Sequence, residues 1–175
     1  MLVSCLMTTK PERFPLVQRA IVDFSRQTLK DSELVIAVAD ANYASRLGNW
    51  VQAYGGDVDV DRLKIICRTF SQPWMGLLYA QAFSTGEVIA SWDDDNLNAP
   101  ERLESQYEFQ DQHPDAITVM ERAFYYFMDT EEVFATSFDR PNGKPAELCV
   151  QSTFMCLRRH MPPLMPYHQP LFGSI

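Results

Sequence analysis

The chain has 175 residues, of which 46% are hydrophobic, and its formal net charge is -8. This length suits one domain with a sizeable core, so we expect a single domain over residues 1–175. The acidic balance, with no basic cluster to offset it, excludes a general nucleic-acid-binding surface. An anionic ligand would need a cation at its binding site.

Cysteine spacing and hydropathy indicate the compartment. Four cysteines, Cys5, Cys67, Cys149 and Cys156, form no C-x-x-C pair, which favours reduced, buried thiols. The sequence shows no signal peptide and no apolar run of about 18 residues, so we expect a cytoplasmic protein without a transmembrane segment. The same composition is compatible with association at a membrane surface.

The first half of the chain alternates apolar runs with helix-like segments. Helices are expected to begin near Pro15, to cover 42–54 and to cover 74–84. Strands that alternate with helices of this length imply a mostly parallel sheet with helices on both faces. The apolar runs that predict the first three buried strands are 2–7, 33–39 and 63–67.

Residues 87–96, E-V-I-A-S-W-D-D-D-N, join an apolar strand to three consecutive carboxylates. In a parallel sheet these acids would lie at the carboxyl end of the strand, where ligands of open α/β sheets bind. Because side chains of an extended backbone alternate, we expect Asp93 and Asp95 to point the same way and Asp94 the opposite way. Two converging carboxylates favour a cation between them, and Mg²⁺ or Mn²⁺ suits oxygen ligands.

Helix capping is the alternative explanation for these polar residues. Asn98, followed by Ala-Pro-Glu, is a good helix start, and we expect it to cap a helix over 100–113. The apolar residues of that helix are Leu103, Tyr107 and Phe109, and its polar remainder is expected to face water. One helix needs one cap, so the three acids upstream need another role.

After Pro114 the pattern changes to aromatic and β-branched runs. These runs predict antiparallel strands or a mixed extension of the sheet, and the proline-rich residues 161–175 predict irregular structure. The expected strands are 117–120, 123–128, 133–138 and 153–157, with a turn at 140–143.

Three blocks resemble the family 2 glycosyltransferases, which are nucleotide-diphospho-sugar transferases of GT-A fold. The blocks are V-S-C-L-M-T-T at 3–9, E-L-V-I-A-V-A-D at 33–40, and T-G-E-V-I-A-S-W-D-D-D-N-L-N-A-P-E-R-L at 85–103. The third is specific, because it joins a Gly-Glu, a buried strand, a D-x-D and a Pro-led helix at the family's spacing. The resemblance implies a Rossmann-like three-layer sandwich in which 1–113 binds the nucleotide sugar and 114–175 is a partial acceptor side.

The resemblance also implies roles for the three acids. Asp93 and Asp95 would form the D-x-D element and hold the metal. Asp95 would be the direct ligand, and Asp93 would lie nearer the ribose or a metal-bound water. Asp94 is a further candidate for donor binding.

Four residues at other strand ends are candidates for contact with the donor. By the resemblance, Asp40 would lie near the nucleoside, and Thr8 and Thr9 would line its base and ribose. Arg68, at the end of the third strand, is a candidate for the diphosphate. The alternatives are a helix cap for Asp40, ordinary loop positions for Thr8 and Thr9, and a surface salt bridge for Arg68.

The sequence departs from the family pattern in two places. Leu77 and Leu78 stand where an Arg-Asn pair is common, and no Asp or Glu follows Glu147, so the family's usual late general base is not evident. We therefore expect a donor-binding portion of a longer protein or a shortened family member, and we assign no catalytic residue. The remaining base candidates are His113, His168, Asp139 and Glu147.

The expected function is metal-dependent, inverting transfer of a sugar from a nucleotide-diphospho-sugar, by preference a UDP-sugar, to an unidentified sugar, lipid or protein acceptor. Bound Mn²⁺ or Mg²⁺ would stabilise the leaving diphosphate. One alternative is a non-catalytic nucleotide-sugar-binding or assembly module. A nucleotidyltransferase is disfavoured, because residues 8–13 contain no glycine and only Lys10 and Arg13 as basic groups. The aromatic run 124–127 is a candidate contact between copies, or part of the core.

Overall fold

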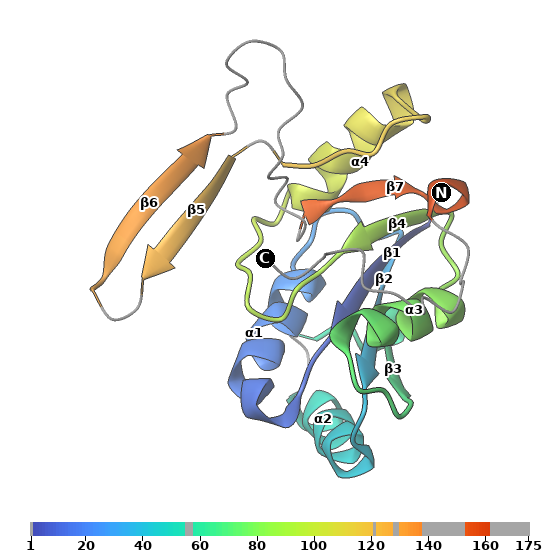
Figure 1. The fold of residues 1–175 in the computed structure, drawn as a ribbon, viewed down its shortest axis with the longest axis vertical. Helices are drawn as coiled ribbons and strands as arrows, with labels where there is room; N and C mark the ends of the chain where they lie inside the picture. Colours follow the sequence, from blue (N-terminus) through green and yellow to red (C-terminus); the bar gives the residue numbers. More distant parts are fainter. Residues whose placement is uncertain (1, 55–57, 121, 128–129, 138–152, 162–175) are drawn as a thin grey trace, which may run out of the picture.

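The protein is described here from a computed structural model, which covers residues 2–54, 58–120, 122–127, 130–137 and 153–161. In this part of the chain the main sheet has five strands in the order β3-β2-β1-β4-β7 (Figure 1). Strands β1 to β4 run parallel, and β7 is antiparallel to β4. The α/β class with a mostly parallel sheet is therefore confirmed. The strand bounds are β1 (Val3–Thr8), β2 (Ser32–Val38), β3 (Leu63–Cys67), β4 (Val88–Ser91) and β7 (Met155–Leu157).

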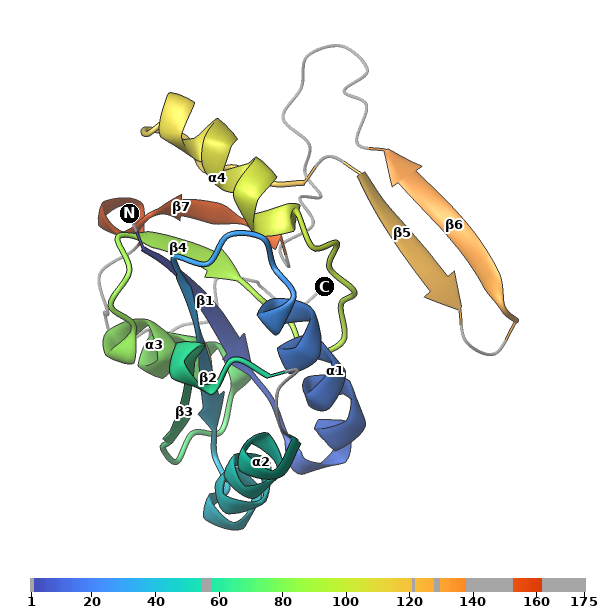
Figure 2. The same cartoon turned by 180° about the vertical axis from the view of Figure 1, so that it is seen from behind.

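Helices cover both faces of this sheet, which confirms the three-layer arrangement. Figures 1 and 2 show α1 and α2 on one face and α3 on the other. The first face also receives Leu103 from α4. The helix bounds are α1 (Phe14–Ser25), α2 (Ala41–Tyr54), α3 (Pro73–Phe83) and α4 (Arg102–Gln112), with 3-10 turns η1 (Pro11–Arg13), η2 (Val60–Arg62) and η5 (Arg158–His160).

Alternation along the strands divides the apolar side chains between two cores. On β1, Cys5 and Met7 pack in the core beneath α1 and α2, whereas Leu6 packs in the core beneath α3. Full burial of a side chain of this size stabilises the fold by about 1.5–3 kcal/mol. Both faces of the sheet are therefore apolar, as the nearly continuous hydrophobic runs predicted.

Trp92, directly after β4, connects the end of that strand to α1. It is fully buried, and its indole N–H donates to the carbonyl oxygen of Ala20 at 3.1 Å. Its ring meets Phe24 edge to face, with centroids 5.5 Å apart. The acids that follow Trp92 therefore begin from a fixed point in the core.

The predicted strands of the second half are confirmed only in part. β5 (Arg122–Phe127) and β6 (Glu132–Ser137) pair with each other in a separate antiparallel sheet that projects from the main body (Figures 1 and 2). The strand expected at 117–120 is wrong, because only Thr118 forms a bridge, to Met155. The turn expected at 140–143 and the segment 162–175 lie outside the described residues.

The expectations about α4 are wrong in two respects. The helix begins at Arg102 without a side-chain cap, and Asn98 instead accepts a hydrogen bond from the Arg102 guanidinium at 3.0 Å. Its polar residues do not all face water, since Gln106 and Gln110 are buried while Phe109 is 54% exposed. The reason is that both glutamine amides donate to backbone carbonyls, including those of Thr153, His113 and Ala116.

No helix within the described ranges is long and apolar enough to cross a bilayer. Cys5, Cys67 and Cys156 are free thiols, and burial raises the pKa of Cys5 to about 12. Cys149 lies outside the described residues.

Candidate functional site

The order of the strands identifies the edge of the sheet where a ligand would bind. β2 and β4 lie on opposite sides of β1, so the chain changes its winding direction between β1 and β4. Ligands of open α/β sheets bind at such a switch point, outside the carboxyl ends of the strands. Leu6 pairs with Ser91, and the Trp92 N–H donates to the Leu6 carbonyl at 3.0 Å. Thr8, the last residue of β1, and Asp93, two residues after β4, therefore lie at the ends of neighbouring strands at this edge.

The three acids after β4 occupy different surroundings. β4 ends at Ser91, and Asp94 and Asp95 lie in a turn, so the period-two alternation of an extended strand does not apply to them. Asp93 is half-buried, Asp94 is 2% exposed and Asp95 is exposed. Only Asp93 and Asp95 therefore have solvent-accessible side chains.

Arg13, from η1, binds two of the three acids with one nitrogen. Its Nη1 donates to Asp94 Oδ1 at 2.6 Å and to Asp95 Oδ2 at 3.0 Å. The expectation that Asp94 points away from Asp95 is therefore wrong, because the turn brings both carboxylates to the same guanidinium. The hydrogen bond to Asp94 is the main reason that the pKa of Arg13 is raised.

Two further arginines fix the backbone of the acidic turn. Arg19, on α1, donates from Nη2 to the carbonyl oxygen of Asp95 at 3.0 Å. Arg102 is buried, its guanidinium lies 5.1 Å from the Trp92 ring centre, and it donates to the Ser91 carbonyl at 2.8 Å and to Asn98. Arg102 thus joins the two ends of the loop that carries the acids.

The surroundings of Asp93 and Asp94 fit a cation. Burial, then the charges of Asp95 and Asp94, raise the pKa of Asp93 to about 6. Asp94 Oδ2 is buried and has no hydrogen-bond partner in the part of the chain that the structure describes. Among the described residues Arg13 alone bonds to these carboxylates, and it and Arg102 offset only part of the negative charge on Asp93; hard oxygen donors of this kind suit Mg²⁺ or Mn²⁺.

Both threonines at the end of β1 are packed against helices. Thr9 is 8% exposed, and its hydroxyl lies 3.2 Å from that of Tyr43 on α2. The methyl group of Thr8 lies so close to α3 that a Cβ at Gly76 would be 2.5 Å from it. Thr8 and Thr9 are therefore at the predicted edge, with Thr9 more enclosed than a loop residue.

Asp40 and Arg68 end the next two strands of the same edge. Asp40 caps α2, because its Oδ1 accepts the Tyr43 N–H at 2.6 Å, so the capping alternative is confirmed as a contact. The Arg68 guanidinium lies 5.3 Å from the ring centre of Phe83. The salt bridge considered for Arg68 is not found among the described residues. Both side chains remain exposed at the edge where the acids lie.

The model of the family described as Glycosyl transferase family 2 matches residues 4–162, which is most of the chain. The chain belongs to glycosyl transferase family 2. A search of curated proteins found no match.

Solved structures share the GT-A fold with this family 2 chain at low identity. They include Staphylococcus aureus TarS 1-349 (TM-score 0.55, 15% identity, covering 68% of this chain and 35% of that one). For the same protein in complex with UDP-GlcNAc the TM-score is 0.57 and the identity 17%, and the match covers 68% of this chain and 34% of that one. For mannosyltransferase PcManGT from Pyrobaculum calidifontis, in complex with GDP-Man and Mn²⁺, the TM-score is 0.57 and the identity 17%. The match covers 68% of this chain and 35% of that one. The chain thus spans about a third of the length of each.

Sequence reasoning about this family 2 chain found the acids but missed the three arginines that hold them. Arg13 was noted only as one of two basic residues after β1, and Arg102 lies inside the family-like block at 85–103. The position of Arg102 four residues after Asn98 was the one local signal of their hydrogen bond. Within the described ranges no group of three or more His, Cys, Asp or Glu side chains is arranged to hold a metal ion alone.

The predicted general base is not located by the structure. His113 ends α4 and stacks on Phe109, with ring centres 4.5 Å apart, which agrees with a helix-end role. Asp139, Glu147 and His168 lie outside the described residues.

Proposed function

We propose that this chain binds a nucleotide-diphospho-sugar through a divalent ion at Asp93 and Asp95, as the donor-binding part of an inverting glycosyltransferase. The observation that carries the proposal is the cluster of three acids at the β1/β4 switch point, with a single guanidinium bound to two of them. Support also comes from family membership and from structural neighbours solved with UDP-GlcNAc and with GDP-Man and Mn²⁺.

The accessible carboxylates would hold the ion, with Asp95 as the direct ligand. An ion bound there supplies Lewis-acid stabilisation of the negative charge on the departing nucleoside diphosphate. Asp94, buried and bonded to Arg13, would act on donor binding by holding the turn in place. Each carboxylate therefore has a role set by its exposure.

The other strand ends would surround the nucleotide. Thr8 and Thr9 would line the base and ribose at β1, and Asp40 would approach the nucleoside with the carboxylate that also caps α2. Arg68, exposed and without a carboxylate partner among the described residues, would meet the diphosphate. An acceptor hydroxyl would displace the diphosphate at the anomeric carbon with inversion.

Calorimetry with UDP and GDP, each with and without Mn²⁺, tests the proposal. We expect binding that requires the metal and is lost in Asp95→Asn. Asp61→Asn is the matched control, because Asp61 is exposed on η2, away from the acids, and makes the same change of charge. Equal nucleotide affinity with and without Mn²⁺ would refute the metal role.

A second assay separates the enzyme from a non-catalytic binding module of the same fold. Hydrolysis or transfer from a UDP-sugar that disappears in Asp95→Asn would establish turnover by this chain. Metal-dependent binding without measurable hydrolysis would support the module instead.

A further inference from the structure

Arg13 holds the two acids of the turn in unequal ways. Its bond to Asp94 is short, at 2.6 Å, and reaches a carboxylate whose side chain is 3% exposed. Its bond to Asp95 is longer, at 3.0 Å, and reaches a side chain that is 47% exposed. Exposed ion pairs contribute little, because water screens them, whereas a charge-assisted bond to a buried carboxylate is strong. Arg13 is therefore anchored at Asp94 and only loosely held at Asp95.

The contact with Asp95 places a guanidinium on the carboxylate that would hold the metal. Asp95 Oδ2 already accepts an N–H, and the guanidinium beside it repels a divalent cation. Charge repulsion therefore favours the release of Arg13 from Asp95 when a divalent ion binds this carboxylate. Asp94 offers no such exchange, since its side chain is buried while the Arg13 side chain that it binds is 41% exposed.

We infer that Arg13 is an internal counter-ion that occupies Asp95 in the metal-free protein and that an incoming divalent ion displaces it from Asp95 while Asp94 retains it. This inference rests on the proposed function, because it concerns the same carboxylate. A cation is thus present at the acids before any metal arrives, as Arg13, but it bridges Asp94 and Asp95 and not the predicted pair of Asp93 and Asp95.

The exchange couples the metal to the nucleotide. Once released from Asp95, the guanidinium stays beside the ion through Asp94, and a cation so close to a bound metal is unfavourable. The negative charge of a diphosphate offsets both cations at once. We therefore expect weak binding of Mn²⁺ alone and a marked gain in Mn²⁺ affinity when UDP is present.

Titration of Mn²⁺ by electron paramagnetic resonance, without nucleotide, tests the inference directly. Arg13→Gln removes the competing cation, and we expect it to bind Mn²⁺ about 5- to 30-fold more tightly than the wild type, from the size of exposed pair and charge-charge energies. The gain in Mn²⁺ affinity produced by UDP should shrink in the same variant. Unchanged or weaker Mn²⁺ binding would overturn the inference.

A second variant keeps the test valid if loss of Arg13 unfolds the turn around Asp94. Arg13→Gln with Asp94→Asn replaces the buried ion pair by a neutral pair and leaves the net charge unchanged. It should still bind Mn²⁺ about 2- to 5-fold more tightly than the wild type, since Asp95 is free. Equal or weaker binding in this double variant would contradict the inference.

Arg26→Gln is the matched control for long-range charge. Arg26 is exposed at the end of α1, and no contact joins it to the acids. Its Mn²⁺ affinity should stay within about twofold of the wild type; an increase equal to that of Arg13→Gln would overturn the inference. Failure of all variants and the wild type to bind Mn²⁺, even with UDP, would instead refute the proposed metal site.

Discussion

Gln27, just beyond the end of α1, supplies the cap that α4 lacks in its own sequence. Its Oε1 accepts the backbone N–H of Leu103 at 3.0 Å, and its Nε2 donates to the Ala99 carbonyl at 2.8 Å. Gln27 is fully buried, so these bonds form away from water. The loop that carries the acids is thereby fixed to α1 at its far end, as Trp92 fixes it at the near end.

Replacing Gln27 tests this cap. Gln27→Leu leaves the Leu103 N–H without its partner, whereas the Ala99 carbonyl still accepts the Arg102 N–H, and we expect a loss of roughly 1–3 kcal/mol in the free energy of unfolding. Urea unfolding followed by circular dichroism measures it. Gln52→Leu, at an exposed position of α2, should cost less than about 0.5 kcal/mol. A loss in Gln27→Leu no larger than in this control would show that the cap contributes nothing.

The parts of the fold that follow from local pattern were predictable. β1 to β4, α2 and α3 were expected within a residue or two of their bounds, and α1 at its start, because each buries an apolar run or stripe whose period is readable in the sequence. The cap of α4 was not, since the hydrogen bond that the Leu103 N–H donates to Gln27 joins residues 76 positions apart. The burial of Gln106 was not predicted for the same reason, because the Thr153 carbonyl that it binds is 47 positions away.

The site was predictable in its acids and not in its cations. Asp93, Asp94 and Asp95 stand together in the sequence, and strand-end geometry gives them a common edge. Arg13 lies 81 positions from Asp94, in a loop with no distinctive pattern. Pairings at that distance depend on the fold, so the alternation argument could not foresee that a turn would join Asp94 and Asp95.

The ionised carboxylate of Asp93 should lower the free energy of unfolding of the metal-free protein at neutral pH. Its folded pKa of about 6 lies above the ordinary value, so its contribution is favourable at low pH and is lost as pH rises through 6. Asp93→Asn mimics the protonated acid, and we expect it to stabilise the metal-free protein by about 1 kcal/mol more at about pH 7.5 than at about pH 5. Thermal or urea unfolding in the presence of a chelator measures this difference.

The matched variant for Asp93→Asn is again Asp61→Asn, which should show no such dependence on pH. If Asp93→Asn destabilises the protein equally at both pH values, then Asp93 makes favourable contacts as an anion and the uncompensated charge at the turn is refuted. If Asp93→Asn stabilises the protein and loses Mn²⁺ binding, then Asp93 serves metal binding at a cost in stability.

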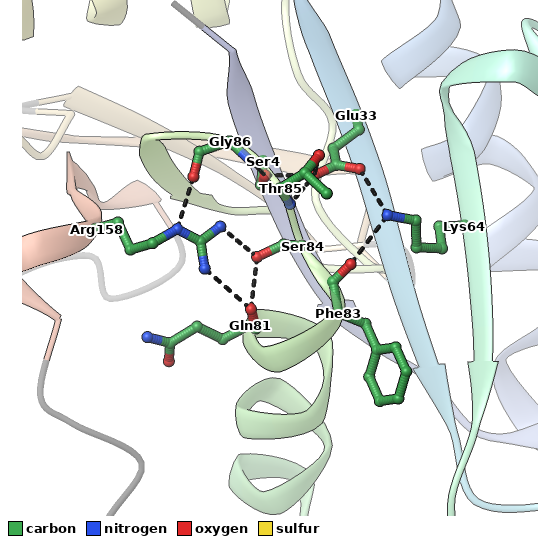
Figure 3. Close-up of polar contacts among 9 residues, drawn as sticks. All are labelled: Ser4, Glu33, Lys64, Gln81, Phe83, Ser84, Thr85, Gly86 and Arg158. Atoms are coloured by element: carbon green, nitrogen blue, oxygen red, sulfur yellow. Dashed lines mark hydrogen bonds and ion pairs between the residues drawn. The ribbon is translucent and has the colours of Figure 1, made fainter.

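Glu33, at the amino edge of the sheet, has a lowered pKa, in contrast to Asp93; Figure 3 shows its polar contacts. Burial alone would raise the pKa of Glu33, but hydrogen bonds from Ser4, from the backbone and hydroxyl of Thr85, and from Lys64 lower it to about 2. A lowered pKa contributes stability above the ordinary value of 4.5 that is lost as pH falls through 2.

Glu33→Gln should therefore lower the free energy of unfolding by roughly 2–3 kcal/mol at neutral pH, and by much less near pH 3. Urea unfolding across this range gives the comparison. Glu108→Gln, at an exposed position of α4, should change it by less than about 0.5 kcal/mol throughout. A Glu33→Gln deficit that stays constant down to pH 3 would mean that packing, and not the charge, is the source of the effect.

Arg158, directly after β7, forms hydrogen bonds with the connection between α3 and β4. Its guanidinium donates to the carbonyl oxygens of Gly86 at 2.7 Å and Gln81 at 3.1 Å, and to the Ser84 hydroxyl at 2.7 Å (Figure 3). These bonds link the end of β7 to the α3–β4 connection and add to the backbone pairing of β7 with β4.

Arg158→Met should cost roughly 2–4 kcal/mol, because two carbonyls and a hydroxyl lose a charged donor while the apolar stem is kept. The neighbouring Arg159→Met removes the same charge from a side chain that is 61% exposed and pairs with Asp115, itself 88% exposed, so we expect a change of less than about 0.5 kcal/mol. Hydrogen exchange of the Ala90 and Met155 amides would locate the effect. Similar losses in both variants would show that charge alone, and not the bonds to the α3–β4 connection, stabilises this edge.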